Sequence, residues 1–193
     1  MSRMPMRGDK MPDTGKQMHF VCTRDELKQV VDKLQRFWVQ NCGCREDRGG
    51  CKRSRTDVCL TWVESSEGSG GSGRREVSRK EVMAILKEAK EKHLVTRPFR
   101  DFETRTTVEG SCFCCDDCCG YFADPAEKCD RGQSVELTRT EDCTDCGKCV
   151  DVCYFKARRM VDGRLLVVHE DCYGCGLCRD VCTAGCIEMV PRG

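Results

Sequence analysis

The chain lacks the features by which membrane, secreted and nucleic-acid-binding proteins are usually recognised. It has no apolar run near the roughly 20 residues that span a bilayer. Its first residues, MSRMPMRGDKMPDTGKQ, carry positive charge but no apolar segment typical of a signal peptide. A net charge of +1 gives no basic field for a nucleic acid. We therefore expect a cytoplasmic protein with neither a membrane nor a nucleic acid as partner.

Residues for acid–base or nucleotide chemistry are also scarce. The three histidines, His19, His93 and His169, have no carboxylate or nucleophile pattern around them. The stretch GSGGSG is followed by no phosphate-binding lysine. We predict no catalytic residues, and the sequence leaves open whether the chain is a carrier or a subunit of an oxidoreductase.

Cysteine, in contrast, is in large excess, at 20 of 193 residues. Adjacent cysteines such as Cys114 and Cys115 are poorly placed to bridge one another, and a reducing compartment keeps thiols free. The hydrophobic share of 39% includes these cysteines, so the ordinary core is thin for the length. Metal ligands that gather only in the folded state can supply the missing folding free energy. We expect the thiols to hold metal.

The clearest metal-binding pattern is an internal duplication near the C-terminus. EDCTDCGKCVDVCYFKARRM, from residue 141, is followed by EDCYGCGLCRDVCTAGCIEM, from residue 170, and each copy contains C-x2-C-x2-C-x3-C. Between the copies, Asp162-Gly163 predicts the turn of a β-hairpin. Cys186, which stands where the first copy has Ala157, is expected to be a small buried residue. Two zinc sites are the alternative interpretation of the two thiol sets.

This spacing resembles that of bacterial two-cluster ferredoxins. The resemblance implies two 4Fe-4S clusters, each bound by three cysteines of one copy and the fourth cysteine of the other. Tyr154 and Thr183 stand where that family usually has proline. The implied ligands are Cys143, Cys146, Cys149 and Cys182 for cluster A, and Cys172, Cys175, Cys178 and Cys153 for cluster B.

A second set of thiols lies toward the N-terminus. A capping box at Thr23 and helically spaced apolar residues predict a helix over 24–40. The segment that follows has four cysteines, a full set for a third cluster or a structural zinc. The basic residues around them either offset cluster charge or form a solvated loop. The cysteines are Cys42, Cys44, Cys51 and Cys59, and the basic residues are Arg45, Lys52, Arg53 and Arg55.

The segment 64–76 has the composition of a flexible linker. A second capping box, at Ser78, predicts a helix that ends near His93, and alternation over 102–108 predicts a strand. The strand leads into SCFCCDDCCG, where four of the five cysteines would bind a fourth cluster. Alternatively, some of them would complete the site begun at Cys42 and Cys44. A structural zinc is again the alternative to a cluster. These five are Cys112, Cys114, Cys115, Cys118 and Cys119. Cys22 and Cys129 are expected to be unligated thiols.

The order of these cysteine blocks resembles a family of anaerobic 4Fe-4S binding proteins over about residues 20–190. That family has the patterns C-P-C-R and C-N-C-C-x-C-C-C ahead of a two-cluster ferredoxin domain, and this chain has CGCR and CFCCDDCC. The resemblance implies cluster binding and electron transfer.

Together these patterns predict an α+β protein stabilised by its cofactors: a disordered tail over 1–20, a small helical, cysteine-rich region over 21–120, a connector over 121–134 and a two-cluster ferredoxin domain over 135–193. The expected function is low-potential electron transfer through two to four 4Fe-4S clusters, to or from a partner oxidoreductase. Two alternatives remain open. One is a redox enzyme or sensor with thiol–disulfide chemistry at Cys112–Cys119, and the other is a zinc-stabilised docking domain with a ferredoxin tail.

Overall fold

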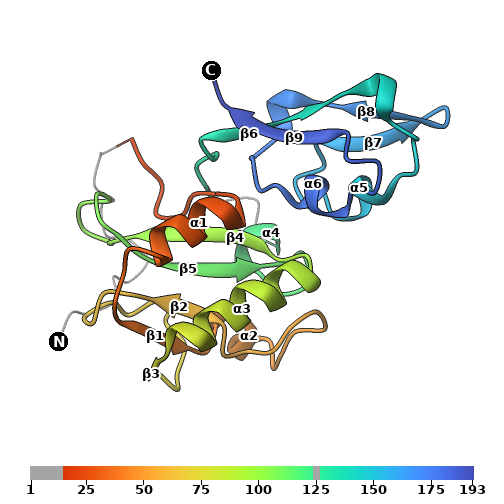
Figure 1. Cartoon of the computed structure of the whole chain (residues 1–193). Coiled ribbons are helices and arrows are strands. Elements are labelled where there is room, and N and C mark those ends of the chain that lie inside the picture. The colour runs from red at the N-terminus through yellow and green to blue at the C-terminus, as the bar shows by residue number, and fades with distance from the viewer. Residues whose placement is uncertain (1–14, 124–126) are drawn as a thin grey trace.

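The computed structural model describes residues 15–123 and 127–193 of the chain. Its N-terminal part is built on a five-stranded antiparallel sheet of order β3-β1-β2-β5-β4, which α1 and α3 cover (Figure 1). The strands are β1 (Phe37–Gln40), β2 (Cys59–Thr61), β3 (Arg75–Val77), β4 (Val95–Arg100) and β5 (Val108–Cys114). The helices are α1 (Arg24–Val31), the short α2 (Gly43–Asp47), α3 (Arg79–Glu91) and the short α4 (Gly120–Ala123).

Both predicted capping boxes are confirmed. The Thr23 and Ser78 side chains accept hydrogen bonds from the backbone N–H groups of Glu26 and Glu81, whose carboxylates accept from the cap N–H groups in return. Helix α3 ends at Glu91, close to the predicted position. The prediction of a helix over 24–40 was wrong beyond Val31, because residues 37–40 form β1. All four residues of β1 are buried, and aromatic and β-branched side chains suit such a strand.

The strand predicted over 102–108 was also wrong. Residues 101–107 form the loop between β4 and β5, and β5 begins only at Val108. The Asp101 carboxylate holds this loop by accepting hydrogen bonds from the N–H groups of Thr104, Thr106 and Thr107, at 2.6, 3.0 and 2.9 Å. The alternating threonines therefore belong to a polar turn and not to a sheet.

The segment predicted to be a flexible linker is packed against the end of β1 and against α2. Gln40 Nε2 donates to the Glu67 carbonyl at 2.6 Å, and the Ser72 N–H donates to the Glu46 carboxylate at 2.8 Å. A Cβ atom added at Gly71 would lie 1.9 Å from the Asn41 carbonyl oxygen. Glycine is needed here for close packing, so the linker prediction was wrong.

The C-terminal part consists of two small antiparallel sheets and two short helices. β6 (Ser134–Thr138) pairs with β9 (Ile187–Pro191), and β7 (Arg158–Val161) pairs with β8 (Arg164–Val167). The predicted hairpin turn is confirmed, because Asp162 and Gly163, with φ of 48° and 76°, join β7 to β8. The helices are α5 (Lys148–Asp151) and α6 (Leu177–Val181), with single 3-10 turns at Thr140–Asp142 and His169–Asp171. The described residues therefore form a fold of the predicted α+β class.

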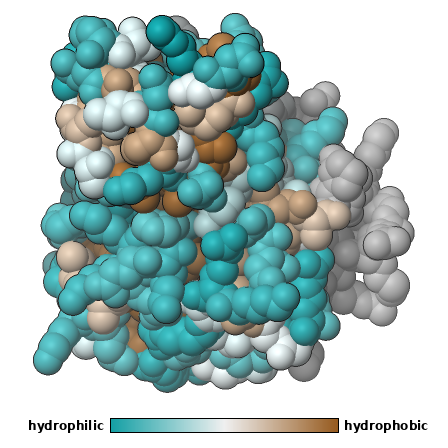
Figure 2. Space-filling view, turned by 90° about the vertical axis from the view of Figure 1, so that its right-hand side faces the viewer, coloured by the Kyte–Doolittle hydropathy of each residue, from teal (hydrophilic) through white to brown (hydrophobic). Residues whose placement is uncertain are grey.

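The two parts are in direct contact. Arg24 of α1 forms an ion pair with Asp180 of α6, and Ser134 donates a hydrogen bond of 2.7 Å to Glu26. His19 and Phe20 form bridges to β4 and to Asp130, so they are not part of the predicted tail; residues 1–14 lie outside the described residues. Figure 2 shows a face on which hydrophilic side chains predominate and apolar ones form small separate groups. Within the described residues, we find no helix long and apolar enough to cross a membrane.

Candidate metal centres

Each predicted C-terminal ligand set lines one cavity. Cavity A is bordered by three cysteines of the first copy and by Cys182 and Cys186 of the second. Cavity B, of similar size, is bordered by three cysteines of the second copy and by Cys153 of the first. The structure thus brings together the thiols that the ferredoxin resemblance implies, with the fourth cysteine exchanged between the copies. The predicted ligands among them are Cys143, Cys146, Cys149 and Cys182 at cavity A, and Cys153, Cys172, Cys175 and Cys178 at cavity B.

Glycines allow the backbone to wrap these cavities. Gly147 and Gly176 precede α5 and α6 with φ of 74° and 76°, a left-handed conformation that other residues adopt at a cost. A Cβ at Gly174 would lie 2.0 Å from the Ser134 carbonyl oxygen, which leaves no room for a side chain. The ligand loops are therefore fixed by backbone geometry as well as by the thiols.

A buried arginine lies between the two cavities. Arg158, the first residue of β7, borders cavity B, and its Nη1 donates a hydrogen bond of 3.2 Å to Cys149 Sγ at cavity A. Its Nη2 forms an ion pair with the buried carboxylate of Glu136. The Oε1 atom of this carboxylate lies 2.8 Å from His169 Nε2. Burial opposes the charge of Arg158, but the Cys178 thiol and the Glu136 carboxylate more than compensate and raise its pKa. Sequence reasoning missed Arg158 and Glu136, because each lies outside the C-x2-C-x2-C-x3-C motifs.

The structure groups the N-terminal thiols differently from the two predicted sets. Six cysteines from both segments border one cavity, here called the N-terminal thiol cavity. Cys59 lies beside it, because pairing of β2 with β5 places Leu60 opposite Ser111 and brings the thiols of Cys59 and Cys112 into contact. The six are Cys42, Cys44, Cys112, Cys114, Cys118 and Cys119.

Thiols in this cavity share protons. Hydrogen bonds from the Cys119 and Cys42 thiols lower the pKa of Cys44. Bonds from Cys112 and Cys119 lower the pKa of Cys114 in the same way. Metal ions bind thiolates and displace such protons, so the donor set suits a thiolate-bound metal or cluster.

A second buried arginine faces these thiols. Arg97 Nη1 lies 3.1 Å from Cys119 Sγ and 3.8 Å from Cys114 Sγ, while Nη2 donates to the Glu127 carboxylate at 2.7 Å. His19 also borders the cavity, and burial together with the charge of Arg97 lowers its pKa to about 4. The sequence offered no signal for Arg97, because strand β4 carries it 15 residues or more away from the thiols it contacts.

Two further thiols, Cys51 and Cys115, form a trio with Cys118, which also borders the N-terminal thiol cavity. The Sγ atoms of Cys51 and Cys118 each lie 3.5 Å from that of Cys115, and all three lie within 4.8 Å of one another. A hydrogen bond from Cys118 lowers the pKa of Cys115 to about 5. The buried guanidinium of Arg45 contacts the Cys118 thiol. Cys51 is therefore separated from Cys42, Cys44 and Cys59, its partners in the predicted third cluster.

The predicted basic loop is only in part solvated. Arg45 is fully buried, and Arg53 and Arg55 are half-exposed and form ion pairs with Asp116 and Glu88 at 2.8 Å. The Cys22 and Cys129 thiols, expected to be unligated, are both buried, and the Cys129 thiol contacts Arg97. Cys186 is buried as expected, with its Sγ 3.5 Å from that of Cys182.

Aromatic side chains fill the space between cavity B and the N-terminal thiol cavity. Phe155 and Tyr173, which border cavity B, are stacked with their centroids 4.3 Å apart. Tyr121 lies 6.3 Å from Tyr173, and the guanidinium of Arg97 lies 4.6 Å from the centre of the Tyr121 ring. Cavity B is thus connected by packed rings to the N-terminal thiols.

Comparison with known families agrees with the C-terminal geometry. A family model described as a 4Fe-4S dicluster domain matches residues 137–183, a range that contains all eight predicted ligand cysteines of the two cavities. No curated protein matches the chain. The C-terminal part is therefore a ferredoxin-like domain that binds 4Fe-4S clusters, and the protein is an iron–sulfur, metal-binding protein. The individual ligands, the N-terminal metals and the resemblance to the anaerobic family stay predictions.

Proposed function

We propose that the protein is an electron carrier with one 4Fe-4S cluster in cavity A, one in cavity B and a third in the N-terminal thiol cavity. The observation that carries the proposal is the exchange of the fourth cysteine. Cys182 completes cavity A and Cys153 completes cavity B, so both sites form only when the two copies fold against each other. A bound 4Fe-4S cluster accepts and releases one electron at a time.

The protein's own contribution is to set charge and access around these sites. Arg158 and Arg97 place a positive charge against the thiolates, which favours the reduced, more negative state. The thiols are mostly buried, which limits access of water, but Cys146 at cavity A is exposed. These features suit a carrier that exchanges electrons with its partner protein at the end of the molecule where cavity A lies.

The two cavities differ in their surroundings, and the difference favours an order in which electrons pass through them. Phe155, Tyr173 and Cys175 of cavity B pack against the core of the N-terminal part, whereas Cys143 and Cys182 of cavity A pack in a separate small core. We therefore propose that a partner oxidoreductase docks at cavity A and that cavity B connects it to the N-terminal thiols.

Metal and sulfide analysis tests the proposal. Anaerobically loaded, full-length protein is expected to contain about twelve irons and twelve sulfides per chain, four of each per cluster. Dithionite should produce the EPR signals of reduced clusters. A loaded protein that gives no such signal would refute electron transfer. The variant Cys146→Ser should lose signal from cavity A, while the matched control Cys22→Ser should not.

The N-terminal thiol cavity favours a second candidate function, the reduction of a disulfide substrate. Several thiols there lie in hydrogen-bond contact and can donate protons, and Arg97 lies beside them as a counter-charge. Cleaving a disulfide takes two electrons and two protons, and the C-terminal sites would deliver the electrons singly. Serine variants of Cys118 and Cys119 would then abolish disulfide reduction while the C-terminal EPR signals persist. Unchanged disulfide reduction in these variants counts against this candidate.

A further inference from the structure

Three thiols from two loops lie closer together than the other metal-ligand candidates. Cys51 comes from the loop after α2, and Cys115 and Cys118 come from the loop after β5. Among the described residues, no other three histidine, cysteine or acidic side chains have ligand atoms within 4.8 Å of one another. The cysteines of cavities A and B, which the 4Fe-4S family model covers, are therefore spread more widely than this trio.

Sulfur spacing separates a single metal ion from a cluster. Four ligands at about 2.3 Å around a tetrahedral zinc place neighbouring sulfur atoms roughly 3.8 Å apart. In a 4Fe-4S cluster each cysteine binds a different iron, so the ligand sulfurs lie farther apart. The two 3.5 Å separations in the trio fit the single ion.

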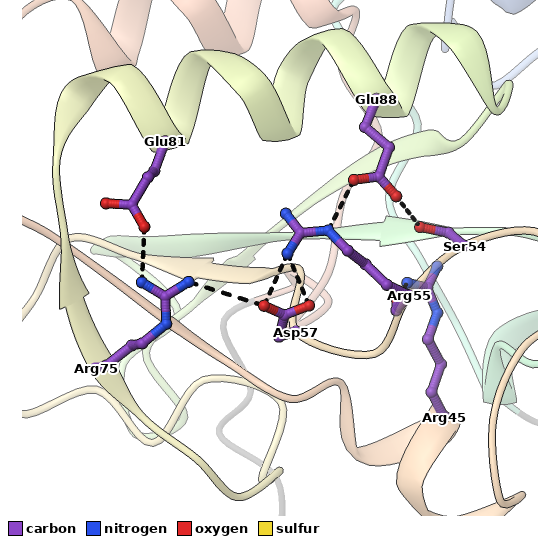
Figure 3. A network of polar contacts seen from close by, with 7 residues as sticks. All are labelled: Arg45, Ser54, Arg55, Asp57, Arg75, Glu81 and Glu88. Atoms are coloured by element: carbon purple, nitrogen blue, oxygen red, sulfur yellow. Dashed lines mark hydrogen bonds and ion pairs between the residues drawn. The ribbon is translucent and has the colours of Figure 1, made fainter.

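The loop that carries Cys51 has little apolar packing. Residues 48–57 form no helix or strand, and Cys51 is their one apolar side chain. On one side Ser54 and Arg55 donate to Glu88 of α3, at 2.9 and 2.8 Å (Figure 3). On the other side the Lys52 N–H donates to the Asp117 carboxylate at 2.9 Å. A metal ion on the trio would fix the loop between these two anchors.

Arg45 supplies the charge that such a site requires. Its side chain is fully buried, and Nη2 donates to the Phe113 carbonyl at 2.9 Å. Within residues 15–123 and 127–193, no carboxylate oxygen lies within ion-pair distance of it. It contacts the Cys118 thiol instead. A buried guanidinium needs a nearby negative charge, and three thiolates around a divalent cation leave one.

We propose that Cys51, Cys115 and Cys118 bind a single zinc ion that is distinct from the iron–sulfur clusters and clamps the two loops together. Asp117, whose carboxylate accepts a hydrogen bond from Cys51, is placed to supply the fourth ligand. Thiolate and carboxylate ligands both suit zinc. The site needs no electron transfer and goes beyond the proposed function. It leaves six N-terminal thiols for the third cluster: Cys42, Cys44, Cys59, Cys112, Cys114 and Cys119.

This site is tested by zinc content and by zinc K-edge X-ray absorption. The sample is full-length protein, expressed with iron and zinc and loaded anaerobically. We expect about one zinc per chain, held by three sulfurs at about 2.3 Å and one lighter atom. Cys51→Ala and Cys115→Ala should each lower bound zinc at least tenfold. The matched control Cys22→Ala, which also removes a buried thiol, should keep it. The C-terminal EPR signals of each variant report whether the protein still folds.

The variant Cys51→His keeps the test decisive if the alanine variants fold poorly. Imidazole binds zinc well, so Cys51→His should retain the ion with one sulfur fewer in its shell. Loaded protein without zinc, zinc that survives Cys51→Ala, or a loss of about four irons in that variant would each overturn the proposal. Missing EPR signals on reduction would instead refute the electron carrier and leave the zinc result unaffected.

Discussion

Replacing Arg158 by methionine should lower the reduction potentials of the two C-terminal sites. Arg158 is 3% exposed and touches both cavities, through its hydrogen bond to Cys149 Sγ and its place in the wall of cavity B. A positive charge favours the reduced state of a cluster, so its removal makes reduction harder. Methionine fills much of the same space without the charge or the N–H donors.

The magnitude follows from Coulomb's law. A unit charge about 5 Å from the added electron contributes roughly 3 kcal/mol at an effective dielectric constant of about 20. The ion pair with Glu136 offsets part of this, and we take about 1–2 kcal/mol as the net effect. Since about 1.4 kcal/mol corresponds to 59 mV for one electron, the midpoint potential should fall by about 40–90 mV. Cavity A should shift more, because it also loses the hydrogen bond to Cys149.

An anaerobic redox titration followed by EPR measures the shift. The matched control is Arg159→Met, which removes the charge of the exposed neighbouring residue and should move the potential by less than about 10 mV because water and salt screen it. In Arg158→Met with Glu136→Gln, which removes both charges of the pair, a smaller decrease is expected than in Arg158→Met. Unchanged or higher potentials in Arg158→Met, or an equal decrease in the control, would refute the reasoning.

Four further outcomes are expected. Ser78→Ala should reduce the free energy of unfolding by about 1 kcal/mol in urea denaturation, since it removes the N-cap of α3. Gly71→Ala should lower the midpoint of thermal unfolding, because the added Cβ meets the Asn41 carbonyl. The control Ser65→Ala, at an exposed position of the same segment, should leave this midpoint unchanged. Equal midpoints for Gly71→Ala and the unchanged protein would mean that the segment is loosely packed. Acid should lower the free energy of unfolding by on the order of 2–3 kcal/mol between pH 6.5 and about 4, because burial lowers the pKa of His19 and the unfolded chain takes up the proton first. Above pH 6.5 the contribution of His19 to the free energy of unfolding is fully present. A stability–pH profile of His19→Gln that matches that of the unchanged protein would contradict this. Removal of metals with a chelator should lower the thermal midpoint in calorimetry, and an equal midpoint with and without metal would show that the cofactors do not stabilise the fold.

The C-terminal site could be predicted from sequence because its ligands are close together along the chain. Three cysteines of each copy fall within seven residues, so their spacing alone constrains how the backbone wraps a cluster. The exchange of Cys153 and Cys182 came from the ferredoxin resemblance, and the cavities agree with it. The helix caps at Thr23 and Ser78 were predictable for the same reason, since a capping box involves residues three apart.

The N-terminal grouping could not be predicted, because it depends on pairing between distant strands. Cys59 and Cys112 are brought into contact by the register of β2 and β5, which no local pattern encodes. Cys51 reaches Cys115 across 64 residues of sequence. Periodicity also misassigned residues 37–40, because a short buried strand and the continuation of an amphipathic helix have similar apolar patterns.

The buried arginines explain why folding and cofactor loading should be linked. Arg45, Arg97 and Arg158 are 0, 1 and 3% exposed, and each contacts a cysteine thiol. A metal-free thiol site places fewer negative charges beside the guanidinium than a site in which every thiol is a metal-bound thiolate. Glu127 and Glu136 compensate Arg97 and Arg158 in part, but Arg45 has no ion-paired carboxylate among the described residues. The metal-free fold therefore carries an electrostatic cost that cofactor binding removes, and that cost is greatest at Arg45, beside the proposed zinc site.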